Sequence, residues 1–190
     1  MTLHSPCEFG AGPGDIVHVR SKGLFAYGIR RAIPQTWGCH DGVLVYDPSR
    51  GWGVGEALYR SGYVITPWEL YARGNAGVVF MRPAGMDDND RRKVVEMVYA
   101  LEKSHPRYDR LAIVGIAMSI LLKRTVQSGR EWEWYCTEVV RDFFRPVGWD
   151  VWRKRYPTPY TTERREQAGK LTLLGEMRVD GCPPYRLKGN

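Results

Sequence analysis

The sequence is poor in cysteine and histidine, with four of each among 190 residues. The cysteines are Cys7, Cys39, Cys136 and Cys182. They show neither CxxC spacing nor the density of a disulfide scaffold, so a disulfide framework is excluded. Cys7 and Cys182 could pair in an oxidising environment, but we expect free thiols. No second cluster of metal ligands accompanies the segment Cys39-His40-Asp41, and we expect neither a metal site nor another cofactor.

The sequence also lacks a secretory signal and a long hydrophobic run. Residues 1–6 have no basic segment followed by an apolar one, so we expect a protein that is cytoplasmic or phage-associated. The most apolar run, residues 111–122, is shorter than the roughly 20 residues of a membrane-spanning helix. We expect a buried helix there, although Lys123 and Arg124 directly after it leave a contact with a membrane surface open.

What the sequence does contain is typical of one compact domain spanning residues 1–190: 43% hydrophobic residues, seven Trp and eleven Tyr. The excess of 28 basic over 21 acidic residues gives a net charge of +7, which favours an anionic polymer or a membrane surface as a partner without selecting one. Basic clusters at residues 152–156 and 164–165 are interpreted as a solvated face. No recognised nucleic-acid module surrounds them, so we predict no specific nucleic acid.

The pattern of secondary structure changes between the two halves of the chain. Strands are expected at residues 14–20, 40–46, 54–58 and 76–81, which clusters of Gly, Pro and Asp separate from one another. Helices are expected from Asp87 to Leu101, at 111–122 and after Cys136, with a return strand at 171–174. Strands followed by helices indicate an α+β domain, in which helices pack on one side of an antiparallel sheet.

Cys136 stands at the start of an amphipathic helix, since Val139, Val140, Phe143 and Phe144 follow it at helical spacing. The free N–H groups and the dipole at a helix start stabilise a thiolate, which makes the cysteine a candidate nucleophile. An inert buried thiol is the alternative, because free cysteine is one of the most buried residue types.

His40 opens the segment His40-Asp41-Gly42-Val43-Leu44, in which a polar and exposed start leads into a continuous apolar strand. Asp47-Pro48-Ser49-Arg50-Gly51 is a turn signal. If residues 47 and 51 pair, then 44 pairs with 54 and 40 with 58, which puts Glu56 diagonal to His40 on the same face. Glu56 is therefore a candidate to orient the ring, whereas a slip by one residue would move it to the other face.

The three other histidines are weaker candidates. His4 lies near the N-terminus, His18 in an expected strand and His105 before a proline. None has an evident acidic partner in the sequence.

Five short motifs occur in an order that resembles the circularly permuted NlpC-like cysteine hydrolases, which are related to papain. They are Gly14-Asp15, Cys39-His40-Asp41-Gly42, Glu56-Ala57, Tyr108-Asp109 and Cys136-Thr137-Glu138-Val139-Val140. In that family the histidine lies on an early strand and the cysteine on a late helix. Two positions depart from its pattern, since Cys39 and Thr137 stand where serine is usual.

The resemblance implies a permuted papain-like fold in which Cys136 is the nucleophile, His40 the base and Glu56 the third residue. Such an enzyme cleaves an amide through an acyl-enzyme, and the expected substrate is a peptide or amide derived from bacterial peptidoglycan. Tyr108 and Tyr135 are candidates to line the substrate pocket, although such tyrosines more often serve only in packing. A lipid-directed hydrolase or acyltransferase, and a module that binds an anionic polymer without turnover, remain the alternatives.

Overall fold

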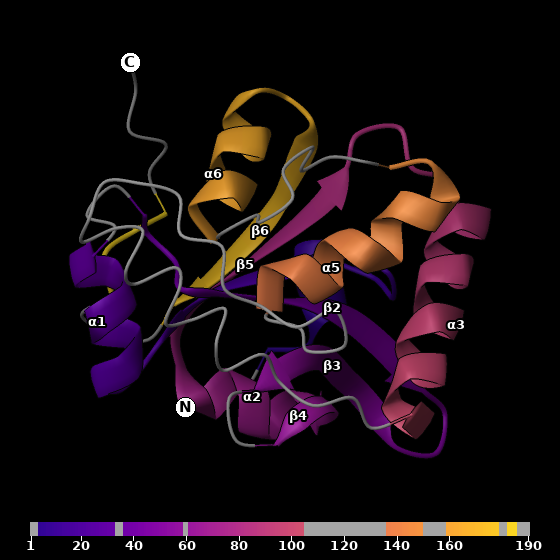
Figure 1. The fold of residues 1–190 in the computed structure, drawn as a ribbon, viewed down its shortest axis with the longest axis horizontal. Helices are drawn as coiled ribbons and strands as arrows, with labels where there is room; N and C mark the ends of the chain where they lie inside the picture. Colours follow the sequence, from indigo (N-terminus) through magenta and orange to yellow (C-terminus); the bar gives the residue numbers. More distant parts are fainter. Residues whose placement is uncertain are drawn as a thin grey trace.

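The computed structural model describes residues 4–32, 36–58, 61–104, 136–149, 159–178 and 182–185. Its centre is a six-stranded antiparallel sheet in the order β4-β3-β2-β1-β5-β6 (Figure 1). The strands are β1 (Ile16–Ser21), β2 (His40–Asp47), β3 (Gly51–Leu58), β4 (Gly62–Pro67), β5 (Asn75–Pro83) and β6 (Leu171–Arg178). The helices are α1 (Leu24–Ala32), α2 (Trp68–Gly74), α3 (Asp88–Ser104), α5 (Cys136–Phe144) and α6 (Pro159–Gln167), with 3-10 turns η1 (Pro6–Phe9) and η2 (Arg145–Val147).

The predicted register of the hairpin formed by β2 and β3 is confirmed. Asp47 pairs with Gly51 and Leu44 with Val54. The Asp47 side chain accepts hydrogen bonds from the backbone N–H groups of Ser49 and Arg50, so local turn chemistry fixes this register. Because side chains alternate between faces along a strand, Glu56 projects on the same face as His40.

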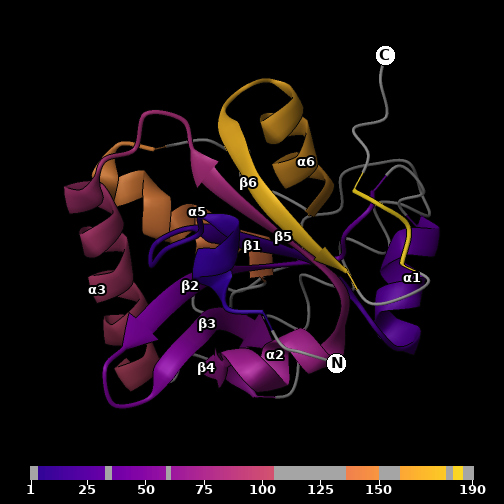
Figure 2. The same ribbon diagram turned by 180° about the vertical axis from the view of Figure 1, so that it is seen from behind.

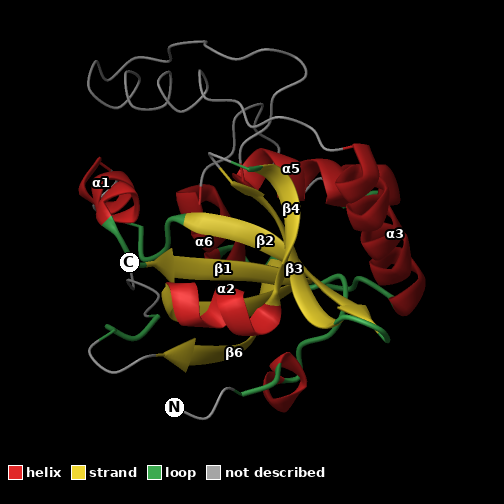
Figure 3. Cartoon of the chain, turned by 90° about the horizontal axis from the view of Figure 1, so that it is seen from below, coloured by secondary structure: helices red, strands yellow, loops and turns green. Residues whose placement is uncertain are grey.

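Helices cover both faces of the sheet, which corrects the expectation that they pack on one side only. Helices α3, α5 and α6 lie on the face seen in Figure 1. On the opposite face, α2 and η1 pack against β3, β5 and β6, as Figures 2 and 3 show. The β2 strand explains the need for both layers, because Val43 and Val45 enter one core while Leu44 enters the other.

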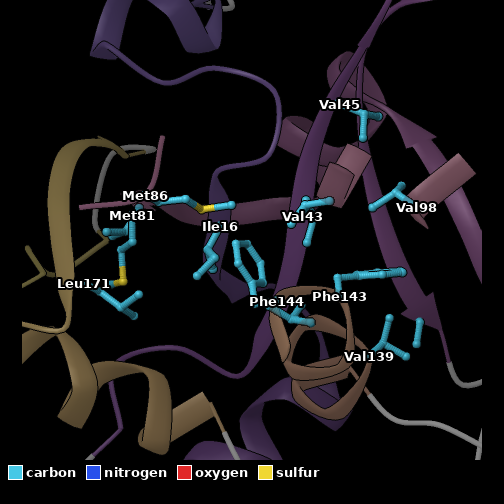
Figure 4. Close-up of a cluster of buried hydrophobic side chains, with 14 of the residues drawn as sticks. Ile16, Val43, Val45, Met81, Met86, Val98, Val139, Phe143, Phe144 and Leu171 are labelled. Atoms are coloured by element: carbon cyan, nitrogen blue, oxygen red, sulfur yellow. The ribbon is translucent and has the colours of Figure 1, made fainter. Parts of the chain in front are cut away.

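The larger core lies between the sheet and the helices α3 and α5 (Figure 4). Phe143 and Phe144 of α5 pack there with Val43, and Phe144 is fully buried. Burying one such side chain contributes about 1.5–3 kcal/mol. This packing fixes the helix against β2 and thereby places its first residue, Cys136, at the start of that strand.

The predicted boundaries of α3 and α5 are close to the observed ones. Asp87 accepts a hydrogen bond from the N–H of Asp90 at 2.8 Å and so caps α3. Helix α5 ends at Phe144, and Gly148 then adopts the left-handed conformation with φ 87°. Helices α1, α2 and α6 and strand β4 were not predicted, and β6 is longer than the expected segment at 171–174.

The Gly14-Asp15 motif at the entrance to β1 is structural. A side chain at Gly14 would collide with the backbone of Arg91, and the φ of Gly14 is 86°, so glycine suits this position. Asp15 is fully buried and accepts hydrogen bonds from Arg82 Nε at 2.7 Å and Arg82 Nη2 at 2.6 Å.

The predicted apolar helix at 111–122 and the basic cluster at 152–156 lie outside the described residues. Within the described part of the chain, no helix has the length and apolar character needed to span a bilayer.

Candidate active site

Cys136 is the first residue of α5 and is 8% exposed. The helix is amphipathic, and the side chains of Val139, Val140 and Phe143 hold it against the sheet core. The N–H groups of the first helical turn have no partner within the helix, and they favour a negative charge at this end. The position predicted for the cysteine is therefore confirmed, and it suits a thiolate.

His40 and Glu56 meet as the hairpin register predicts. His40 Nε2 lies 2.7 Å from Glu56 Oε2. The two side chains are only 15% and 5% exposed, so solvent screens this interaction weakly. With Nε2 occupied by the carboxylate, Nδ1 is the ring nitrogen left for Cys136.

The second carboxylate oxygen of Glu56 also has a partner. Thr66 of β4 donates its hydroxyl hydrogen to Glu56 Oε1 at 2.5 Å. Because both carboxylate oxygens are engaged, the side chain of Glu56 is held in one orientation towards His40. Thr66 was not predicted as a site residue; the β-branched run Val64-Ile65-Thr66 before Pro67 was the available signal for its strand.

The charge state of His40 follows from these neighbours. Burial lowers the pKa of His40, but its electrostatic interaction and hydrogen bond with Cys136 raise it, as do the hydrogen bond and the charge of Glu56. The pKa of His40 ends well above its ordinary value. The protonated ring of His40 is therefore favoured at neutral pH.

A cavity of about 350 Å³ opens beside His40 and Glu56. His40 and Glu56 line it, and Leu58, Leu70 and Tyr71 supply apolar wall. The remaining lining residues are Ser21, Lys22, Ala26, Cys39, Ala57, Thr66, Gly74 and Asn75. The cavity has the size of a small-molecule site, and the candidate base His40 lies in its wall.

Tyr71 of α2 is a second unpredicted residue at this cavity. Its hydroxyl is buried and has no hydrogen-bond partner among the described residues. Burial raises the pKa of Tyr71, and the charges of Glu56, Asp41 and Cys136 raise it further. The phenol is thus a neutral group with an unused donor.

Two expectations about polar residues near the site are wrong. His18 was thought to lack an acidic partner, yet its Nδ1 lies 2.7 Å from Asp41 Oδ1 and its Nε2 lies 3.1 Å from Glu163 Oε1. The start of β2 was thought to be exposed, yet Asp41 is fully buried and Cys39 is 3% exposed. His4 also has an acidic neighbour, Glu8, at 2.8 Å on the surface.

Other predictions have plainer outcomes. Tyr108, Tyr135 and His105 lie outside the described residues, so their proposed or excluded roles stay predictions. Cys7, Cys39, Cys136 and Cys182 are all free thiols. Within the described ranges, no group of three or more His, Cys, Asp or Glu residues is arranged to hold a metal ion.

The comparisons with known proteins show a fold and not a family. No protein-family model matches the chain, and no curated protein matches it. Solved structures that do match include the crystal structure of metalloprotein YiiX from Escherichia coli O157:H7, of DUF1105. The match covers 88% of this chain and 98% of YiiX with a TM-score of 0.53 and 15% sequence identity. The chain therefore has an α+β fold like that of YiiX.

Proposed function

We propose that this chain is a cysteine hydrolase of the permuted papain-like type, formed by residues 1–190 as one domain. Cys136 is the nucleophile, His40 the general base and acid, and Glu56 the residue that orients the base. The contact series from Cys136 through His40 to Glu56 supports this proposal most strongly, because it matches the nucleophile, base and orienter of thiol hydrolases.

The proposed reaction uses groups that the protein already contains. The Cys136 thiolate attacks the carbonyl carbon of an amide, and a sulfur–carbon bond forms. His40 donates its proton to the leaving amine as the carbon–nitrogen bond breaks. Water then attacks the thioester, His40 accepts a proton from it, and the sulfur–carbon bond breaks, which releases the acid and restores the Cys136 thiolate beside protonated His40. Backbone N–H groups at the start of α5 stabilise the oxyanion.

No cofactor takes part in the proposed steps. YiiX is described as a metalloprotein, but the described residues of this chain offer no cluster of ligands for a metal ion. The residues at the site therefore do not fit a bound metal, and we derive no step through one. Substrates of the proposed enzyme are peptides or amides, with peptidoglycan fragments as the first class to test.

A second candidate is a thiol hydrolase or acyltransferase that acts on lipid esters. The walls of the cavity favour it, since Leu58 and Leu70 line a space that opens beside His40. Leu70 is 61% exposed, so an acyl chain bound in the cavity would cover apolar surface there. Incubation with muropeptides and, separately, with phospholipid vesicles distinguishes the two substrate classes by which one is consumed.

Alkylation by iodoacetamide tests the proposed nucleophile without knowledge of the substrate. Cys7 is exposed and serves as an internal reference thiol. An ordinary thiol is only about 3% ionised at pH 7, so a thiolate held beside His40 should react about tenfold faster or more. Mass spectrometry of the two peptides reports both rates from one sample.

Two outcomes decide the proposal. If Cys136 reacts no faster than Cys7 at pH 6–7, Cys136 is not an activated nucleophile and the proposal fails. Cys136→Ala should abolish turnover of whichever substrate is consumed and leave the melting temperature close to that of the wild type. Cys7→Ala is the matched control and should retain full turnover, because Cys7 lies outside the site.

A further inference from the structure

A second buried histidine lies one strand away from the proposed pair. His18 of β1 is fully buried, and each of its ring nitrogens faces a carboxylate, that of Asp41 at 2.7 Å and that of Glu163 at 3.1 Å. Burial lowers the pKa of His18, but the charges and hydrogen bonds of the two acids raise it to about 10. The ring is therefore a cation between two anions.

The other oxygen of Asp41 connects this cluster to the nucleophile. Asp41 Oδ2 accepts a hydrogen bond from Thr137 Oγ1 at 2.6 Å and another from Thr162 Oγ1 at 3.0 Å. Asp41 directly follows His40, and Thr137 directly follows Cys136. One short hydrogen bond thus joins the neighbour of the base to the neighbour of the nucleophile.

Glu163 holds the chain that leads into the base. Its Oε1 accepts hydrogen bonds from Thr36 Oγ1 at 2.6 Å, the Trp37 N–H at 2.8 Å and the Gly38 N–H at 3.0 Å. Residues 36–38 come just before the strand that begins at His40. The backbone on both sides of His40 is therefore fixed by the same group of charges.

Stability alone does not account for such a cluster. Well-packed apolar residues of similar volume stabilise a core as well as buried ion pairs do, or better. Asp41 lies in a strand, where aspartate is disfavoured. Both of its carboxylate oxygens form hydrogen bonds, and the partners come from three different elements. The free-energy cost of burying these charges is explained if the cluster positions the residues of the proposed active site.

We infer that Asp41, held by His18, is a positioning residue that fixes Cys136 against His40 through the hydroxyl of Thr137. The inference rests on the proposed function and assigns a task to residues outside the Cys136, His40 and Glu56 series. Reacting groups that shift by about 1 Å can lose on the order of 100-fold in rate. Loss of the Thr137 hydrogen bond should therefore reduce the reactivity of Cys136 more than it reduces the stability of the fold.

The test compares three substitutions. Thr137→Val removes the hydroxyl and keeps the shape, Thr137→Ser keeps the hydroxyl, and Thr162→Val removes the other hydroxyl that donates to Asp41 Oδ2. For each variant we would measure the melting temperature and the alkylation rate of Cys136 relative to Cys7 between pH 5 and 9. Thr137→Ala replaces Thr137→Val should the latter not fold.

The expected pattern separates positioning from stability. Thr137→Val should alkylate about tenfold more slowly than wild type at pH 6–7, with a changed pH profile. Thr137→Ser should restore the rate to within about twofold, and Thr162→Val should melt earlier yet keep the wild-type rate and profile.

Three results overturn the inference. In the first, Cys136 of the wild type is alkylated faster than Cys7, and Thr137→Val shows the same alkylation rate and pH profile as the wild type. This result leaves the proposed function intact. Another is an equal loss in Thr137→Val and Thr162→Val, which indicates general loosening. The last is a wild-type Cys136 no faster than Cys7, in which case the proposed function fails and the inference fails with it.

Discussion

Substituting Glu56 by Gln changes one charge at the site and keeps the size of the side chain. The carboxylate of Glu56 lies 2.7 Å from His40 Nε2, and both side chains are largely buried. A hydrogen bond to a charged group in this setting contributes about 1.5–3 kcal/mol. The preference of the folded protein for a protonated His40 should therefore fall about 10- to 100-fold, and the ring should titrate at a lower pH than in the wild type.

The same substitution predicts a pH-dependent loss of stability. The pKa of His40 in the folded protein is raised above its ordinary value of 6.5. A raised pKa stabilises the folded state fully below the unfolded value, and this contribution is lost as the pH rises through the folded value. Glu56→Gln should lower the free energy of unfolding by about 1.5–3 kcal/mol at pH 6, and the difference from wild type should shrink at high pH.

Two measurements check this prediction. NMR of the 15N-labelled imidazole rings gives the titration midpoint of His40, and urea unfolding at a series of pH values gives the free energy of unfolding. His18 also titrates, with a pKa of about 10, but it is common to both proteins and cancels in the difference.

The matched control is Glu8→Gln, which breaks the same pair of residue types on the surface. His4 and Glu8 are 51% and 53% exposed, and we expect no measurable change in unfolding there because solvent screens the pair. The reasoning is refuted if Glu56→Gln leaves the midpoint of His40 unchanged or raises it, or if its loss of stability is the same at every pH.

Three further substitutions, with Gly74→Ala as the control for the first, test packing and ion pairing by urea unfolding. Gly38→Ala places a methyl group against the ring of His18, which two carboxylates hold in place, and should lower the free energy of unfolding by about 1–3 kcal/mol. Gly74→Ala places its methyl group in open space and should not lower the free energy of unfolding. Equal effects of the two substitutions would contradict this reasoning. Tyr71→Phe removes a hydroxyl without a partner among the described residues, so stability should stay the same or rise by about 1 kcal/mol, and a clear loss would reveal a missed partner. Arg82→Met leaves the buried Asp15 carboxylate without its cation and should cost about 3 kcal/mol, and a loss well under half of that would refute the pairing.

Local sequence signals were enough to predict the hairpin that carries His40 and Glu56. The turn at Asp47 fixes the pairing of Leu44 with Val54, and strand geometry then determines which residues share a face. The start of α5 was predictable for the same reason, because the apolar spacing after Cys136 is a property of one short segment.

Residues that meet across long stretches of chain were beyond such reasoning. His18 and Glu163 are separated by 145 positions, and Asp41 and Thr137 by 96. Nothing in either local segment identifies the partner. The one usable signal was Asp41 itself, since an aspartate inside an apolar strand calls for a buried partner.

The covering of both faces of the sheet was missed because α2 is short and begins directly after β4. Its buried residues Trp68, Tyr71 and Ala72 are too few to give a clear helical period. The continuous apolar run in β2 was nonetheless a correct sign of a two-sided strand.

The hydrogen bonds of His18 and Asp41 with Thr137, Thr162 and Glu163 form in a fixed order during synthesis. A ribosome releases the β2 strand with His40 long before it releases α5 or α6, because the chain emerges from its N-terminus. Until residues 159–167 have been made, His18 lacks Glu163 and Asp41 lacks Thr162. A growing chain therefore holds Asp41 and His18 without their full set of partners until α6 has docked.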